Sequence, residues 1–250
     1  MLVCKALVTL LSFTEELKMK KLTGSLFVLF TVLISALFGG DFEKNDDLVK
    51  ELKKNHVRLV VLCNFQGTNN LLDIVTSSRS PGFELTDYGL AMLNDAASAL
   101  ASQHIAYIYT SSAYRAQQTA SLLGKAFYLT PRQILVSNFL EMQNFGSANG
   151  EDYDVYKERF SSTKEMLEAT PSNGESGLSV FKRSEYFLKN LTNFNHCTIL
   201  IVTYAFNYCH ISKCLTGKYG VIPSPGTFII YDFNVSNEGF SLGDIYPKDL

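Results

Sequence analysis

One arginine stands where a charged side chain could bind an anion. Arg115 follows a short run of β-branched and aromatic residues, 105–110, and two serines, Ser111 and Ser112. We expect the run to form a strand and the serine hydroxyls to cap the helix that follows, with Arg115 in its first turn. Free backbone N–H groups beside a guanidinium attract an anion. The segment is therefore the strongest candidate for a binding site.

Polar residues also follow other apolar runs. Residues 59–63 lead into a polar loop that begins with Asn64, and residues 198–202 lead into Thr203 and Tyr204. In an α/β protein the loops at the carboxyl ends of the strands form the ligand site. Glu141 lies shortly after a third short run, 134–136, and could supply a carboxyl proton.

Strands and helices alternate along the chain, which predicts the α/β class. Besides the strands above, residues 227–233 have the pattern of a last strand. Helical spacing or helix-start signals mark residues 86–103, 151–167, 176–190 and 209–215.

The sequence motifs around these positions resemble those of the histidine phosphatase superfamily, the phosphoglycerate-mutase-like proteins. Residues 115–120 carry the family's Arg-Ala-x-Gln-Thr-Ala, preceded by serines. The family's first strand ends in Leu-Val-Arg-His-Gly-Glu-Thr. Matching Thr68 to that Thr puts Asn64 on the Arg and Phe65 on the nucleophilic His. Tyr204 stands at the family's second His, and Glu141 near its acidic residue.

The resemblance implies a three-layer α/β/α sandwich with a mostly parallel sheet. It also implies a degenerate member that lacks both catalytic histidines, because a phenyl ring has no lone pair with which to attack phosphorus. The vestigial pocket would be lined by Asn64, Phe65, Thr68, Arg115, Glu141 and Tyr204. Such a pocket favours an apolar, neutral or peptide-like ligand, or a protein partner, over a phosphoester.

Two other functions stay open at this point. One is an active phosphoester hydrolase with an atypical site, in which Arg115 and Glu141 would act with water as the nucleophile. The other is a purely structural envelope protein, for which substitutions in the pocket would have no effect.

The N-terminal segment predicts targeting to a membrane. Lys18, Lys20 and Lys21 precede residues 22–40, which carry no charge and are rich in large apolar residues. This layout is typical of a signal peptide or signal anchor. Residues 1–40 would then export the domain, or tether it to a membrane through residues 22–40, with Met19 as an alternative start. We expect a linker or solvated helix at 41–56 and the domain at 57–250.

The composition of the chain limits the classes of partner and cofactor that we expect. A net charge of −2 over 250 residues, without a basic stripe, gives no electrostatic reason to expect nucleic acid. The cysteines are scattered without a C-x-x-C pair, so we expect buried thiols, no metal site and no cofactor. They are Cys4, Cys63, Cys197, Cys209 and Cys214.

Overall fold

The computed structural model describes residues 43–77, 81–233 and 241–242 of the chain. The predicted signal segment, residues 1–40, and the alternative start at Met19 lie outside these residues. Within them, no helix has the length and apolar character that crossing a membrane requires.

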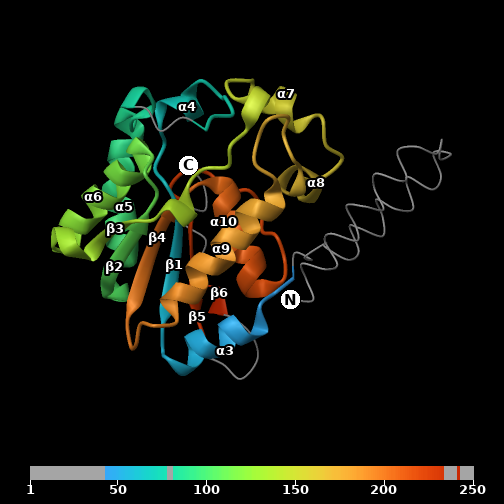
Figure 1. Cartoon of the computed structure of the whole chain (residues 1–250). Coiled ribbons are helices and arrows are strands. Elements are labelled where there is room, and N and C mark those ends of the chain that lie inside the picture. Colours follow the sequence, from blue (N-terminus) through green and yellow to red (C-terminus); the bar gives the residue numbers. More distant parts are fainter. Residues whose placement is uncertain (1–42, 78–80, 234–240, 243–250) are drawn as a thin grey trace, which may run out of the picture. The chain divides into compact units, whose positions relative to one another are not determined.

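A six-stranded mixed sheet forms the middle of the domain (Figure 1), in the order β3-β2-β4-β1-β5-β6. The first four of these strands run parallel, while β5 is antiparallel to β1 and β6 is antiparallel to β5. Their bounds are β1 Arg58–Cys63, β2 Ile105–Thr110, β3 Ile134–Val136, β4 Thr198–Thr203, β5 Phe228–Asp232 and β6 Ser241–Leu242. The predicted α/β class with a mostly parallel sheet is confirmed.

Helices cover both faces of this sheet and connect its strands. The α-helices are α3 Asp46–Lys54, α4 Thr68–Leu71, α5 Asp87–Leu100, α6 Tyr114–Ala126, α7 Tyr153–Lys157, α8 Thr163–Glu168, α9 Gly177–Leu191 and α10 Ala205–Thr216. Short 3₁₀ turns are η1 Pro81–Phe83, η2 Ala101–Gln103, η3 Pro131–Gln133, η4 Asn138–Leu140 and η5 Gly146–Ala148.

The sheet separates two apolar cores, one on each of its faces. Alternate residues of a strand point to opposite faces, so β1 contributes Val60 and Leu62 to one core and Leu59 and Val61 to the other. Helices α5 and α6 pack on the first core, and α3, α9 and α10 pack on the second. These two helical layers complete the predicted three-layer sandwich.

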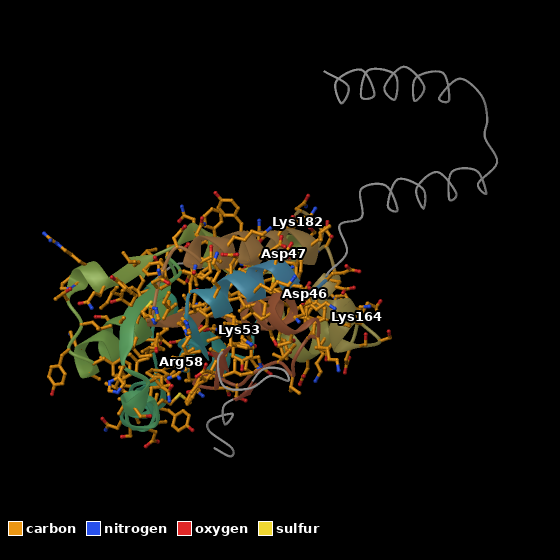
Figure 2. All side chains as sticks on the ribbon, turned by 90° about the horizontal axis from the view of Figure 1, so that it is seen from below. Asp46, Asp47, Lys53, Arg58, Lys164 and Lys182 are labelled. Atoms are coloured by element: carbon orange, nitrogen blue, oxygen red, sulfur yellow. The ribbon has the colours of Figure 1, made fainter. Side chains whose placement is uncertain are left out.

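Helix α3 belongs to the second core rather than to a solvated linker. Leu48 and Leu52, one helical turn apart, are buried in that core. Seen from below (Figure 2), Asp46, Asp47 and Lys53 lie on α3 among the surface side chains. The segment 41–56, which we expected to be a linker or a solvated helix, therefore contains a helix that packs on the domain.

Two local predictions differ from the structure. The amphipathic segment 151–167 forms two short helices, α7 and α8, each capped by its own side chain, Asp152 and Ser162. The last helix, expected at 209–215, begins four residues earlier at Ala205. Its first turn is polar and aromatic, so apolar periodicity did not reveal it.

The connections after β1 and β4 leave the sheet in opposite directions. After β1 the chain continues to α5 on one face, and after β4 it enters α10 on the other. Because β1 and β4 are neighbours, a crevice opens at their carboxyl ends. Ligands of open α/β sheets bind at such a point.

Candidate functional site

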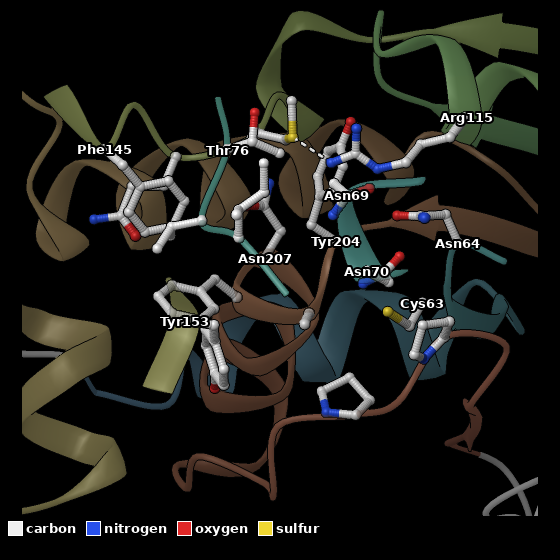
Figure 3. Close-up of a pocket in the computed structure, with 18 residues that line it drawn as sticks. Cys63, Asn64, Asn69, Asn70, Thr76, Arg115, Phe145, Tyr153, Tyr204 and Asn207 are labelled. Atoms are coloured by element: carbon white, nitrogen blue, oxygen red, sulfur yellow. Dashed lines mark hydrogen bonds between the residues drawn. The ribbon is translucent and has the colours of Figure 1, made fainter. Parts of the chain in front are cut away.

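A pocket of about 130 Å³ lies at this crevice (Figure 3). Its described walls come from the end of β1, from α4 and the loop after it, and from the segment after η4. The starts of α6, α7 and α10 and the loop before β5 complete the lining. The polar lining residues are Asn64, Asn69, Asn70, Thr76, Arg115, Gln143, Tyr153, Tyr204 and Asn207. Three of the six predicted pocket residues are therefore brought together, namely Asn64, Arg115 and Tyr204.

Arg115 lies in the first turn of α6 and is only 3% exposed. Its Nη2 donates to the sulfur of Met142 at 2.9 Å, and its guanidinium carbon lies 5.0 Å from the centre of the Tyr204 ring. Among the described residues no Asp or Glu forms an ion pair with it. Burial lowers the pKa of Arg115, while the neighbouring Tyr204 and Cys63 raise it in part.

Tyr204 is the N-cap residue of α10 and is 8% exposed. Its hydroxyl forms a hydrogen bond of 3.1 Å with Oγ of Ser111. Ser111 and Ser112 do not cap α6 as expected, because the N-cap residue is Ala113, which has no side-chain acceptor. Ser111 instead accepts a bond from the Ala113 N–H at 3.3 Å and so holds the loop beside Tyr204.

Asn64 follows β1 directly and lines the pocket. Its backbone N–H donates to the carbonyl of Thr203 at 2.8 Å, which joins the ends of β1 and β4. Its side-chain amide donates to the carbonyl of Phe65 at 2.8 Å. The residue is thus both a wall of the pocket and part of the backbone network that shapes it.

Phe65 does not line the pocket. Its ring is fully buried in the core beneath α5 and α6, together with Met92 and Tyr204, and its backbone N–H donates to Oγ1 of Thr119 at 3.1 Å. Removing the phenyl ring from water into an apolar core stabilises the fold by about 25 cal/mol per Å² of apolar surface. Our expectation that Phe65 is a pocket residue is corrected accordingly.

Thr68 and Glu141 also lie beside the pocket without lining it. Thr68 begins α4 and its hydroxyl donates to the carbonyl of Glu84 at 3.2 Å. Oε1 of Glu141 accepts the Ser112 N–H at 2.9 Å, so this carboxylate helps to fix the loop before α6. The buried Glu141 therefore has a structural contact at the place where we expected an acid.

Apart from Asn64, sequence reasoning missed the amide side chains of the pocket. Asn207 donates from Nδ2 to the carbonyl of Glu141 at 2.8 Å, and Gln143 donates from Nε2 to the carbonyl of Glu175 at 2.9 Å. Both are almost fully buried. Their oxygens, like Oδ1 of Asn69, have no hydrogen-bond partner among the described residues. A polar residue three places into an otherwise buried helix was the only signal for Asn207.

Cys63, the last residue of β1, contributes a thiol to the pocket wall. Burial raises its pKa to about 12, and the nearby positive charge of Arg115 offsets this only in part. At neutral pH the group is therefore a thiol and not a thiolate. The thiolate is the nucleophilic form, so Cys63 is not activated for attack.

The histidines lie elsewhere. His56, His104 and His196 precede β1, β2 and β4, at the opposite end of the sheet from the pocket. The rings of His56 and His196 stack with their centres 4.6 Å apart. The fourth, His210, is buried in α10. In the described part of the chain no group of His, Cys, Asp or Glu side chains is arranged to hold a metal ion.

Solved structures share this fold. The mycobacterial glucosyl-3-phosphoglycerate phosphatase in complex with VO3 has a TM-score of 0.61 at 19% identity, over 74% of this chain and 96% of that one. The protein TTHB049 from Thermus thermophilus has a TM-score of 0.56 at 22% identity, over 70% and 93%. At such identities the likeness shows the fold alone. No curated protein matches the sequence significantly.

The sequence itself places the chain in a family. The family model described as "Histidine phosphatase superfamily (branch 1)" matches residues 68–217, more than half of the chain. The match includes the segment of Arg115 and Tyr204 and begins just after Asn64 and Phe65. Together with the sheet order and the position of the pocket, it identifies this chain as a member of the histidine phosphatase superfamily.

Proposed function

We propose that this chain is a catalytically inactive member of its superfamily, a pseudophosphatase that acts by binding a ligand in the pocket at the ends of β1 and β4. The proposal is carried by the chemistry of the pocket wall. Among the described lining residues there is no histidine, lysine, aspartate or glutamate. A phosphoryl-transfer site needs a nucleophile and a group that accepts or supplies a proton.

The other polar groups at the pocket do not supply a nucleophile or a general base. The Cys63 thiol stays protonated at neutral pH, and the Tyr204 hydroxyl is engaged with Ser111. An attacking water would need a base, and the carboxylate of Glu141 is turned toward the Ser112 N–H, outside the pocket lining. These contacts count against the atypical hydrolase that uses Arg115 and Glu141.

Assays on the purified full chain test the proposal. With p-nitrophenyl phosphate and other generic phosphoesters we expect phosphate release at the rate of buffer alone. Arg115→Met and the exposed control Arg132→Met should be indistinguishable from the native chain. Turnover that the native chain and Arg132→Met share, and that Arg115→Met loses, would make the protein an enzyme.

We further propose that the domain is exported, and either released or tethered to a membrane through residues 22–40. The support is the order of lysines followed by a long uncharged apolar run. Mass spectrometry of the mature N-terminus in cell fractions tests this. A soluble, unprocessed chain inside the cell would contradict it.

A further inference from the structure

The buried guanidinium of Arg115 has no anionic partner in the described structure. Its described contacts are a thioether sulfur and an aromatic ring. The arginine stem passes Gly67, where a Cβ would come within 2.7 Å of Cδ. A buried charge costs several kcal/mol unless it is paired. Neither a thioether nor a neutral ring can replace a carboxylate or phosphate in that role.

The charge of the lining limits what can pair with it. Arg115 carries the only formal charge among the described lining residues. A carboxylate has one negative charge and matches a guanidinium with two parallel hydrogen bonds. A phosphate monoester carries about −1.5 to −2 at pH 7 and would leave excess negative charge enclosed without a counterion. Charge matching therefore favours a monoanion.

The amide oxygens of the pocket favour a ligand that carries hydrogen-bond donors in addition to its anionic group. In Asn207 and Gln143 the NH₂ groups already donate to backbone carbonyls, which fixes the side-chain oxygens as acceptors. These two oxygens and Oδ1 of Asn69 have no described partner. In Figure 3 Asn207 and Asn69 lie between Phe145 and Arg115. A buried acceptor without a partner is costly, so ligand O–H or N–H groups would stabilise this wall.

We propose that the pocket binds a small carboxylic acid, with the carboxylate on Arg115 and with hydroxyl or amide N–H groups directed to the amide oxygens. This inference rests on the ligand-binding function proposed above and names its chemical class. The volume of about 130 Å³ suits a compact molecule.

Matched ligand pairs test the role of the charge. Glycerate and glyceramide differ only in the carboxylate, as do N-acetylglycine and N-acetylglycinamide. At about 10 mM, a concentration at which a site of millimolar or tighter Kd raises Tm by mass action, each acid should raise the Tm of the full chain. Titration should give a Kd for the better acid about tenfold or more below that of its amide. Comparing the Kd of glycerate with that of N-acetylglycine shows whether the amide oxygens accept better from hydroxyl groups or from an amide N–H.

A third ligand tests the donors. Propionate retains the carboxylate of glycerate without its hydroxyls, and we expect it to bind more weakly. Equal affinity for glycerate and propionate would show that the amide oxygens do not accept hydrogen bonds from the ligand's hydroxyls, and would overturn that part of the proposal.

Substitution of Arg115 supplies an independent readout. Without ligand, Arg115→Met removes an unpaired buried charge and fills similar volume, so Tm should stay unchanged or rise by about 2–4 °C. With either acid, the ligand-induced shift of this variant should vanish, whereas Arg132→Met retains it. A Tm that falls in Arg115→Met without ligand would show that the guanidinium is structural, and would overturn the inference.

The outcomes separate this inference from the proposed function. If glycerol 2-phosphate produces the larger Arg115-dependent shift without being hydrolysed, the protein remains a binding pseudophosphatase and the carboxylate assignment is wrong. If the neutral amides match the acids, the assignment is wrong as well. Arg115-dependent hydrolysis of glycerol 2-phosphate would reject the pseudophosphatase itself.

Discussion

The guanidinium of Arg115 lies 5.0 Å from the centre of the Tyr204 ring, and the hydroxyl of that ring forms a 3.1 Å hydrogen bond with Ser111. The three residues come from the start of α6, the start of α10 and the end of β2. The ring thus has a cation on its face and a serine at its hydroxyl. This arrangement positions the one charged group of the described pocket wall.

The Ser111–Tyr204 contact should be measurable as a coupling energy. Tyr204→Phe and Ser111→Ala each remove one partner of a buried hydrogen bond and should each cost about 1 kcal/mol of unfolding free energy, while the phenyl ring still packs on Arg115. The double variant should cost less than the sum by about 0.5–1.5 kcal/mol, as measured by urea unfolding. Strictly additive losses would mean that the two groups do not interact in solution.

Gly89→Ala should destabilise the domain although alanine favours helices. In an exposed helix interior this change stabilises by about 1 kcal/mol, but here the new Cβ would lie 2.1 Å from the backbone oxygen of Gln66, which cannot move aside freely. We expect a net loss of about 2 kcal/mol or more in urea unfolding. Gly220→Ala is the control, because its nearest neighbour would be 3.8 Å away. Equal stabilities of the two variants would contradict the close approach of α5 to the loop after β1.

His210 should make the domain less stable in acid. Burial, and then the positive charge of Arg183, lower the pKa of His210 to about 3, and the backbone of Leu167 raises it in part. The unfolded chain binds the proton near pH 6.5, whereas the folded chain does not until about pH 3. Stability from this group is therefore complete above pH 6.5 and is lost between pH 6.5 and 3, with a slope of at most about 1.4 kcal/mol per pH unit.

Urea unfolding between neutral pH and pH 4 measures this slope. The slope of His210→Leu should be smaller than that of the native chain. His104→Asn is a suitable control, because His104 is exposed and asparagine tolerates its backbone φ of 49°. Parallel curves for the native chain and His210→Leu would show that His210 is not kept neutral by the fold.

Thiol labelling should distinguish Cys63 from Cys197. Burial raises the pKa of Cys63 to about 12, and Cys209 and Cys214 are buried as well, while Cys197 is partly exposed. In a Cys4→Ser background, maleimide at neutral pH should add to Cys197 first, as read by peptide mass spectrometry. Faster labelling of Cys63 than of Cys197 would show an open, activated thiol, and would weaken the case against catalysis.

The sheet was predictable because its strands are short, apolar and bounded by polar loops. The predictions of β2 at 105–110 and β3 at 134–136 match the structure residue for residue. Helix ends were less predictable, since the first turn of α10 carries Asn207 and Tyr208 rather than an apolar stripe. Phe206 and Tyr208 of that turn are buried in the second core, so tertiary packing stabilises the turn, which periodicity does not report.

The candidate site was predictable only in part. Arg115, Asn64 and Tyr204 follow strands or begin helices at the crevice, so the topology alone brings them together. Phe65 stands next to Asn64 in sequence yet lies in the same core as Val60 and Leu62. Strict alternation along β1 would put it on the other face, but the strand ends at Cys63 and the alternation does not continue past it. The amide of Asn69 comes from the single-turn helix α4 and that of Gln143 from the irregular segment after η4, and no pattern in the sequence determines where either segment lies.

The two walls of the pocket belong to different layers of the sandwich. Arg115 enters from α6 on one face of the sheet and Asn207 from α10 on the other. An occupant held by both would act as a strut between the layers. Hydrogen exchange should then slow in the first turns of both helices at once, so that amides on opposite faces of the sheet report a single binding event.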